Sequence, residues 1–86
     1  MSLFYSHQRV GEAYFTDDEG TDYRNFEAAY AAAVAGARDL MCAEVRQGHL
    51  SLDQSLELHD ALGGHLATIK FADALRISFP KQLPPQ

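Results

Sequence analysis

The chain has 86 residues, of which 47% are hydrophobic and 22% are charged, and its formal net charge is −5. This length allows one small domain with a modest core, and the composition excludes extensive disorder. The excess of acidic residues argues against a nucleic-acid partner, because binding to phosphates requires clustered Lys and Arg.

Cysteine content and hydropathy indicate the cellular compartment. The single cysteine, Cys42, excludes an intramolecular disulfide and favours a reducing environment. No apolar run approaches the roughly 18–20 residues that cross a bilayer. The first seven residues, MSLFYSH, lack the basic segment and the long apolar core of a signal peptide. We therefore expect a cytoplasmic protein that has no membrane partner.

Two aromatic-rich segments near the N-terminus predict a β-hairpin. Residues 3–10 and 13–16 contain the aromatic and branched residues that suit strands. Gly11 lies between these segments, in or beside the predicted turn. Residues 17–22 follow with four acids, one glycine and no apolar side chain, which predicts a loop.

Residues 26–47 carry the strongest signal in the sequence and predict an amphipathic helix. Asn25 suits the N-cap, and Gly48 suits the left-handed position after the helix. Apolar residues recur at spacings of three and four, which predicts the stripe that faces the core. The stripe consists of Phe26, Tyr30, Ala33, Ala37, Leu40, Met41 and Val45.

A second hairpin is predicted after the helix. Residues 54–59 alternate between apolar and polar, residues 60–64 are typical of a turn, and residues 65–71 resume as a strand. One helix cannot bury its apolar stripe alone. The order β-β-α-β-β therefore predicts a two-layer α+β fold, with one long helix packed on a four-stranded antiparallel sheet.

The end of the chain completes this organisation. Residues 71–75 predict a helical turn, and residues 76–79 predict a short extended end. Residues 80–86 contain three prolines and predict a flexible tail. We expect one domain over residues 1–79, followed by this proline-rich tail.

The order of these motifs resembles that of a bacterial family of short, uncharacterised domains. The resemblance covers most of residues 3–77. It rests on these segments: Phe4-Tyr5 with His7 nearby, Asp18-Glu19-Gly20, Asn25 to Ala29, Ala37 to Leu40, Leu56 to Leu58, Asp60 to Gly63, and Phe71 to Leu75. It implies the two-layer architecture and brings no activity, cofactor or site.

Histidines, acids and the cysteine are the candidates for chemistry. His59 and His65 flank the second turn, and imidazoles with a carboxylate can bind Zn²⁺. The acidic segment Asp17–Asp22 offers oxygens of the kind that Ca²⁺ prefers. Neither group follows a known ligand spacing, so hairpin-end residues and a solvated loop are the simpler interpretation. Cys42 lies far from the helix N-terminus, which predicts packing and not catalysis. We expect no catalytic residue and no cofactor.

The predicted helix also carries a run of small side chains. Ala28, Ala32 and Gly36 lie four residues apart, as do Ala31 and Ala35, and no residue from 28 to 37 is charged. A helix face that meets only water usually carries Glu, Lys and Arg. Alanine is also the best helix former, which is the simpler explanation. We predict that two copies of the chain associate either through this helix, with these five residues at the interface, or through an edge of the sheet.

These observations favour a non-enzymatic, self-associating protein-interaction or regulatory module, with a homodimer as the expected state. Two alternatives remain open. An antitoxin-like domain would use its net charge of −5 to shield a basic protein. A small metal-binding protein would use His59, His65 and the acidic loop.

Overall fold

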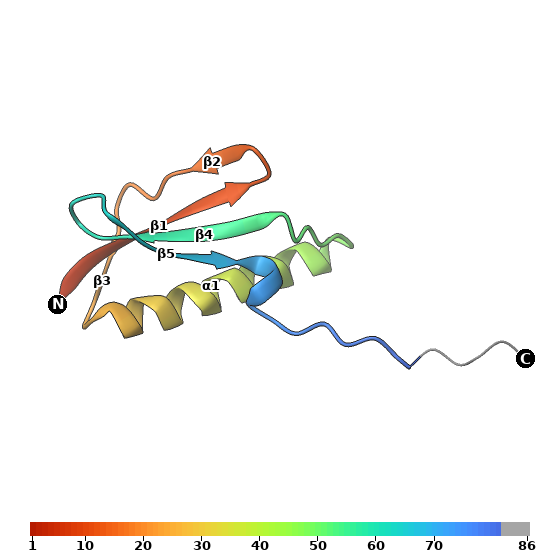
Figure 1. The fold of residues 1–86 in the computed structure, drawn as a ribbon. Helices are drawn as coiled ribbons and strands as arrows, with labels where there is room; N and C mark the ends of the chain where they lie inside the picture. The colour runs from red at the N-terminus through yellow and green to blue at the C-terminus, as the bar shows by residue number, and fades with distance from the viewer. Residues whose placement is uncertain (82–86) are drawn as a thin grey trace, which may run out of the picture.

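The computed structural model describes residues 1–81 as two layers, one helix and one antiparallel sheet (Figure 1). This confirms the predicted α+β architecture. The end of the predicted proline-rich tail, residues 82–86, lies outside the described residues.

The sheet has five strands. They are β1 (Ser2–Val10), β2 (Ala13–Phe15), β3 (Thr21–Tyr23), β4 (Gln54–His59) and β5 (His65–Lys70). Four of these follow the order β2-β1-β4-β5, and β3 pairs with the beginning of β1. The two hairpins meet where β1 pairs antiparallel with β4, in a register that places Tyr5 opposite His59 and Val10 opposite Gln54.

The prediction of four strands was wrong by one, because the acidic loop ends in a strand. Thr21 to Tyr23 return alongside Phe4 to Ser2. The return is possible because Gly20 has φ +70°, and a Cβ atom there would lie 3.0 Å from the carbonyl oxygen of Phe4. A side chain at this position would therefore separate β3 from β1.

Helix α1 (Phe26–Arg46) begins and ends near the predicted positions. Asn25 caps it, since its Oδ1 accepts a hydrogen bond of 2.9 Å from the amide of Ala28. Gly48 has φ +81°, which allows the chain to leave the helix. The sequence alone was sufficient to locate this element.

The predicted apolar stripe of the helix was partly wrong. The buried residues are Ala29, Ala33, Ala37 and Met41, whereas four members of the predicted stripe are exposed. These four are Phe26, Tyr30, Leu40 and Val45. A row of small residues four apart allows the helix backbone to lie close to the sheet, and the larger side chains then point to its two flanks.

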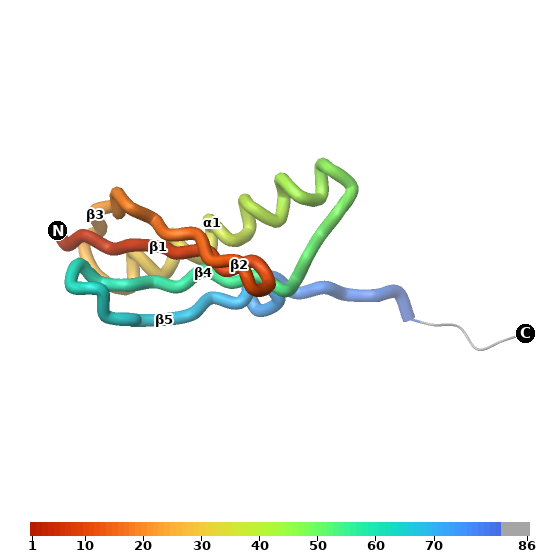
Figure 2. The backbone as a smooth tube through the Cα atoms, turned by 90° about the horizontal axis from the view of Figure 1, so that it is seen from above, coloured from red at the N-terminus to blue at the C-terminus, as the bar shows by residue number. Residues whose placement is uncertain are grey.

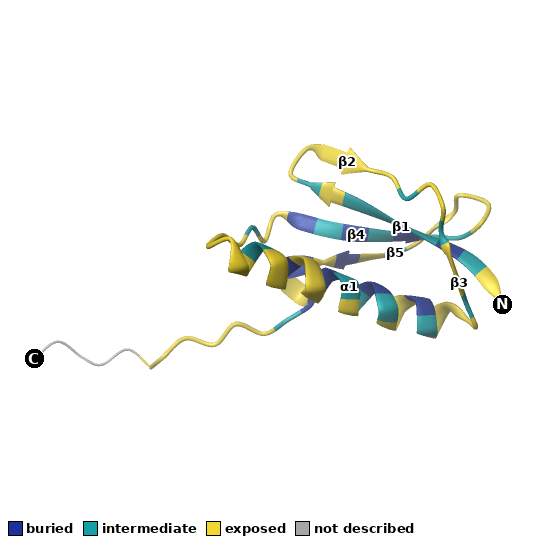
Figure 3. Ribbon diagram, turned by 180° about the vertical axis from the view of Figure 1, so that it is seen from behind, coloured by how far each residue is buried: buried dark blue, intermediate teal, exposed yellow. Residues whose placement is uncertain are grey.

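The core lies between α1 and the second hairpin. Ala33, Ala37 and Met41 pack with Leu56 and with residues of β5 and of the short helix η1 (Phe71–Asp73). A smaller cluster joins Phe4, Ala29 and Leu58. Strand β2 lies at the edge of the sheet and is exposed along its length (Figures 1 and 3). The inner face of the sheet is the one that meets α1. The helix covers β4, β5 and the start of β1 on this face and leaves β2 and the hairpin end of β1 open.

The chain after η1 leaves the body of the domain. Residues 76–81, which we call the arm, are exposed and form neither helix nor strand. Both views of the backbone show the arm running away from the two layers (Figures 1 and 2). The described molecule is accordingly elongated, with extents of 60 × 25 × 21 Å.

Candidate functional site

The five residues of the predicted interface do not share one environment. Ala31 and Ala35 are exposed on the side of α1 that faces away from the sheet, whereas Ala28, Ala32 and Gly36 are half-buried. A Cβ atom at Gly36 would lie 3.9 Å from Cδ1 of Leu56, so this position faces the sheet. The structure therefore leaves only Ala31 and Ala35 fully open to a partner.

A groove separates the second half of α1 from the first hairpin. This hairpin groove has a volume of about 540 Å³. Its lining residues are Gln8, Val10, Phe15, Leu40, Ala43, Glu44, Gln47 and Gln54. Phe15 and Leu40 keep 57% and 38% of their surface exposed, so apolar side chains lie open on both walls. The groove exists because α1 packs on β3, β4, β5 and on Phe4 at the start of β1, and leaves β2 and the hairpin end of β1 open.

Gln54 fixes the floor of the hairpin groove. It is the one buried polar side chain among the described residues. Its Nε2 donates to Oε1 of Glu44 at 2.8 Å and to the carbonyl of Ser51 at 2.9 Å. Its Oε1 accepts from Nε2 of Gln8 at 3.1 Å. Sequence reasoning missed this residue, although a glutamine at an inward position of an alternating strand was a visible signal.

A second groove lies on the opposite flank of α1. It is lined mainly by Met41, Cys42, Val45, Leu50 and Leu75. Arg38 also lines it, and its Nε donates to the carbonyl of Ala74 at 2.7 Å, which ties the end of η1 to the helix. Cys42 is exposed here, so the expectation that it packs in the core was wrong.

Three histidines gather on the outer face of the sheet. The rings of His59 and His65 have centroids 5.3 Å apart, as the hairpin predicted, and His7 joins them at 4.6 Å from His59. Both ring nitrogens of His59 already face protein acceptors, Oε1 of Glu57 and the carbonyl of Gly63, each at 3.3 Å. Among residues 1–81, no group of three His, Cys, Asp or Glu side chains is arranged to hold a metal ion.

Glu57 joins three strands at the centre of this outer face. Its carboxylate accepts hydrogen bonds from Arg9 and Tyr14, both at 3.2 Å, and from His59. Partial burial alone would raise the pKa of Glu57, but the hydrogen bonds outweigh it and hold that pKa below its ordinary value. Burial, and then the charge of Glu57, raise the pKa of Tyr14. The polar groups of this face therefore bind one another.

The acidic loop is a structural turn. Asp17 accepts hydrogen bonds from the amides of Ser6, Glu19 and Gly20, and its own amide donates to Nδ1 of His7 at 2.9 Å. Burial acts to raise the pKa of Asp17, but these backbone hydrogen bonds lower it further than burial raises it. The Asp17 oxygens that were candidates for Ca²⁺ ligands thus hold the turn against β1.

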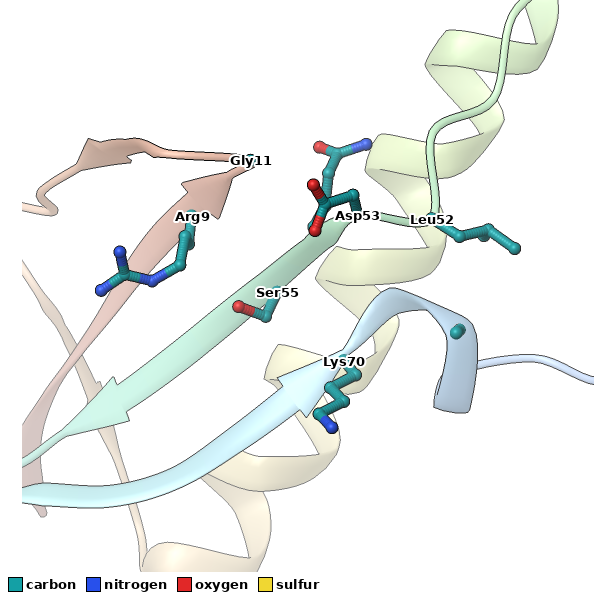
Figure 4. A pocket seen from close by; sticks show the side chains of 8 residues that line it. Arg9, Gly11, Leu52, Asp53, Ser55 and Lys70 are labelled. Carbon is teal, nitrogen blue, oxygen red and sulfur yellow. The ribbon is translucent and has the colours of Figure 1, made fainter.

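A shallow hollow of about 270 Å³ lies where β1 and β5 end and β4 begins (Figure 4). Arg9, Asp53 and Lys70 line it, together with Gly11 and Ser55. Figure 4 shows that the charged ends of Arg9 and Lys70 point away from Asp53. The hollow therefore lacks a convergent set of polar groups of the kind that fixes a small ligand.

Fold and surfaces together define a small two-layer α+β domain with open apolar grooves on both flanks of its helix. The chain belongs to the family described as domain of unknown function DUF6894, whose model matches residues 3–72. No curated protein and no solved structure matches the chain. None of the helices in residues 1–81 combines the length and the hydrophobicity that crossing a membrane requires.

Proposed function

We propose that this domain is a non-enzymatic, self-associating protein-interaction module. The observation that carries the proposal is the apolar surface on the helix side of the domain, which residues 1–81 leave uncovered. Phe15 and Leu40 line one flank of α1, and Val45 and Leu50 line the other, all in contact with solvent. Open apolar surface of this kind is characteristic of protein–protein contacts.

The uncharged first half of α1 supports a contact between copies. Ala31 and Ala35 are exposed, and no residue from 28 to 37 carries a charge. Small side chains on an exposed helix face allow a second backbone to approach closely. We propose that this face contributes to the interface, with Ala28, Ala32 and Gly36 at its border with the sheet.

The polar groups support a role other than catalysis. The candidate acids and bases of the outer face are bonded to one another, as Glu57 is to Arg9, Tyr14 and His59. A general base needs a free hydrogen-bonding position toward its substrate. The proposal therefore places function in surface contacts and assigns no catalytic residue.

Sedimentation equilibrium of the full chain tests self-association. We expect the average mass to rise from that of one chain to that of two between low micromolar and high micromolar concentration. Ala35→Glu places a charge on the exposed face and keeps helix propensity close to that of alanine, so it should shift the equilibrium toward the monomer. Ala61→Glu, in the exposed turn between β4 and β5, is the matched control. A constant mass of one chain at all concentrations would contradict the proposal.

A second candidate is an antitoxin-like role as the acidic partner of a basic protein. Residues 1–75 contain all twelve Asp and Glu but only five of the seven Lys and Arg, which favours a basic surface as partner. Co-expression with the product of an adjacent gene tests this role. A salt-sensitive complex in which that product loses toxicity would support it, and failure to co-purify would contradict it.

A further inference from the structure

The arm presents apolar side chains to solvent in an alternating pattern. Ile77 and Phe79 are 44% and 83% exposed, and Arg76 and Ser78 alternate with them. In an extended segment, alternate side chains point to opposite sides. Ile77 and Phe79 therefore form one apolar side of the arm, in line with Leu75. Leu75 packs against the core, whereas Phe79, at the far end of this side, keeps most of its surface exposed.

The residues that come directly before the arm are held against the body of the domain. Ala74 is buried in the core, and its carbonyl accepts the hydrogen bond from Nε of Arg38. Leu75 lines the groove on the Met41 flank of α1, and the chain leaves the body directly afterwards. The arm thus starts from an anchored position and points outward.

The hairpin groove offers an apolar surface that is large enough for the side chains of the arm. Its apolar walls are Val10, Phe15, Leu40 and Ala43. Its volume of about 540 Å³ lies within the range of about 300–1,000 Å³ for clefts that enclose a small ligand, so it has room for the side chains of Ile77 and Phe79. Six extended residues reach about 20 Å.

Charge makes the arm and the rest of the chain complementary. The arm carries two bases, Arg76 and Lys81, and no acid. Residues 1–75 carry five bases and twelve acids, a net charge of −7. Glu44 lies in the lining of the hairpin groove, whereas Arg38 and Arg46 line the groove on the other flank. A basic arm is therefore attracted to the hairpin groove and repelled from the other one.

We propose that the arm of one copy docks in the hairpin groove of a second copy, so that two chains exchange arms. The inference rests on the proposed self-association and adds a second contact to the one proposed for the exposed face of α1. A second copy is the occupant because a chain's own arm leaves on the opposite flank of α1 and points away from its own hairpin groove. In a two-fold dimer the same contact forms twice.

Arm variants of the full chain give the first test. Phe79→Asp and Ile77→Asp should each weaken dimerisation by about 30-fold or more, because each places a charge among apolar groove walls. Ser78→Asp introduces the same charge on the other side of the arm and should leave the dimer nearly unchanged. Sedimentation velocity measures the association, and thermal unfolding should be nearly equal for the three diluted variants, since all three positions are exposed.

A groove variant and a mixing experiment give the second test. Ala43→Arg places a bulky base on the groove wall, keeps helix propensity, and should dissociate the dimer. Ala61→Arg makes the same change at an exposed position outside both grooves and is its control. An equimolar mixture of Phe79→Asp and Ala43→Arg should form heterodimers, because the arm of the second variant is intact and the groove of the first is intact.

The outcomes separate this inference from the proposed function. A wild-type chain that stays monomeric overturns both. A wild-type dimer that persists in Phe79→Asp and Ile77→Asp overturns the arm exchange alone, as does Ser78→Asp dissociating as strongly as they do. If both single variants are monomeric but their mixture forms no heterodimer, the arm and the groove do not bind each other.

Discussion

The two halves of the inner sheet face are ordered by different forces. The half formed by β4 and β5 is covered by α1, and Leu58, Ile69 and Phe71 are almost completely buried there. The half formed by β1 and β2 has an open groove instead, and Phe15 remains 57% exposed. Hydrogen bonds of Asp17, Gly20 and Glu57 hold this second half in place. Packing against α1 therefore stabilises β4, β5 and the start of β1, whereas turn geometry and polar contacts stabilise β2 and the hairpin end of β1.

The largest expected effect tests the covered half. Phe71→Ala removes a side chain that has no exposed surface and should cost about 3–5 kcal/mol of unfolding free energy, which is most of the stability of a small domain. Phe71→Leu, a milder change, should leave a folded protein with a lower midpoint in urea. Phe15→Ala in the open half should cost less than about 1 kcal/mol when measured on the diluted, monomeric chain. Equal losses of unfolding free energy in Phe71→Ala and Phe15→Ala would contradict this difference between the two halves of the sheet.

The next effect tests the turn that holds the open half. Gly20→Ala combines a left-handed backbone with a contact of 3.0 Å to the carbonyl oxygen of Phe4, and should cost about 2–3 kcal/mol. Gly63 has φ +84° but nothing within 4 Å of its Cβ position, so Gly63→Ala should cost only about 1 kcal/mol. Urea unfolding of both variants measures the difference. Equal costs would show that the close approach of β3 to β1 is unimportant.

A smaller effect is expected when the pH is lowered. The pKa values of Asp17 and Glu57 are lowered in the folded chain. Their contribution to stability is therefore complete above their unfolded pKa values, near 4, and is lost as pH falls through the lower folded values. We expect the protection of the β2 and β3 amides, relative to their intrinsic exchange rates, to fall below about pH 4, before that of the β4 amides. Asp17→Asn should weaken the dependence of this protection on pH. An unchanged dependence on pH in that variant would count against the role of the turn.

The smallest effect concerns the outer face. Glu57→Gln weakens the charged bonds to Arg9, Tyr14 and His59 but keeps the shape. It should cost about 0.5–1 kcal/mol, because water reaches the Arg9 side chain and ion pairs open to solvent contribute little. Tyr14→Phe removes one of these bonds and should cost less. Hydrogen exchange of the β2 amides is the sensitive measurement. If Glu57→Gln lowered the hydrogen-exchange protection of β5, which packs against α1, as much as that of β2, the two halves of the sheet would not differ as described.

Prediction from the sequence succeeded where the signal was local. The cap at Asn25, the glycine at position 48 and the alternation in residues 54–59 each depend on neighbouring residues, and each marked its element correctly. The short strand β3 was missed because three residues have no periodicity and only pairing with β1 makes them a strand. The side chains that line the hairpin groove, and those that bond to one another on the outer face, come from segments far apart in the chain. Their spacing in the sequence therefore could not predict that they meet.

One long capped helix between two hairpins, and the two-layer fold that this order implies, follow from the sequence alone, as do the acidic charge and the single cysteine. Local backbone preferences and hydrophobic periodicity are sufficient for these features. Only the tertiary structure decided which residues of α1 are buried, how Gln54 joins α1 to β1 and β4, and that Phe15, Leu40 and Phe79 stay uncovered. Burial depends on how closely and at what angle the helix meets the sheet, and that geometry is set by contacts between residues far apart in the chain.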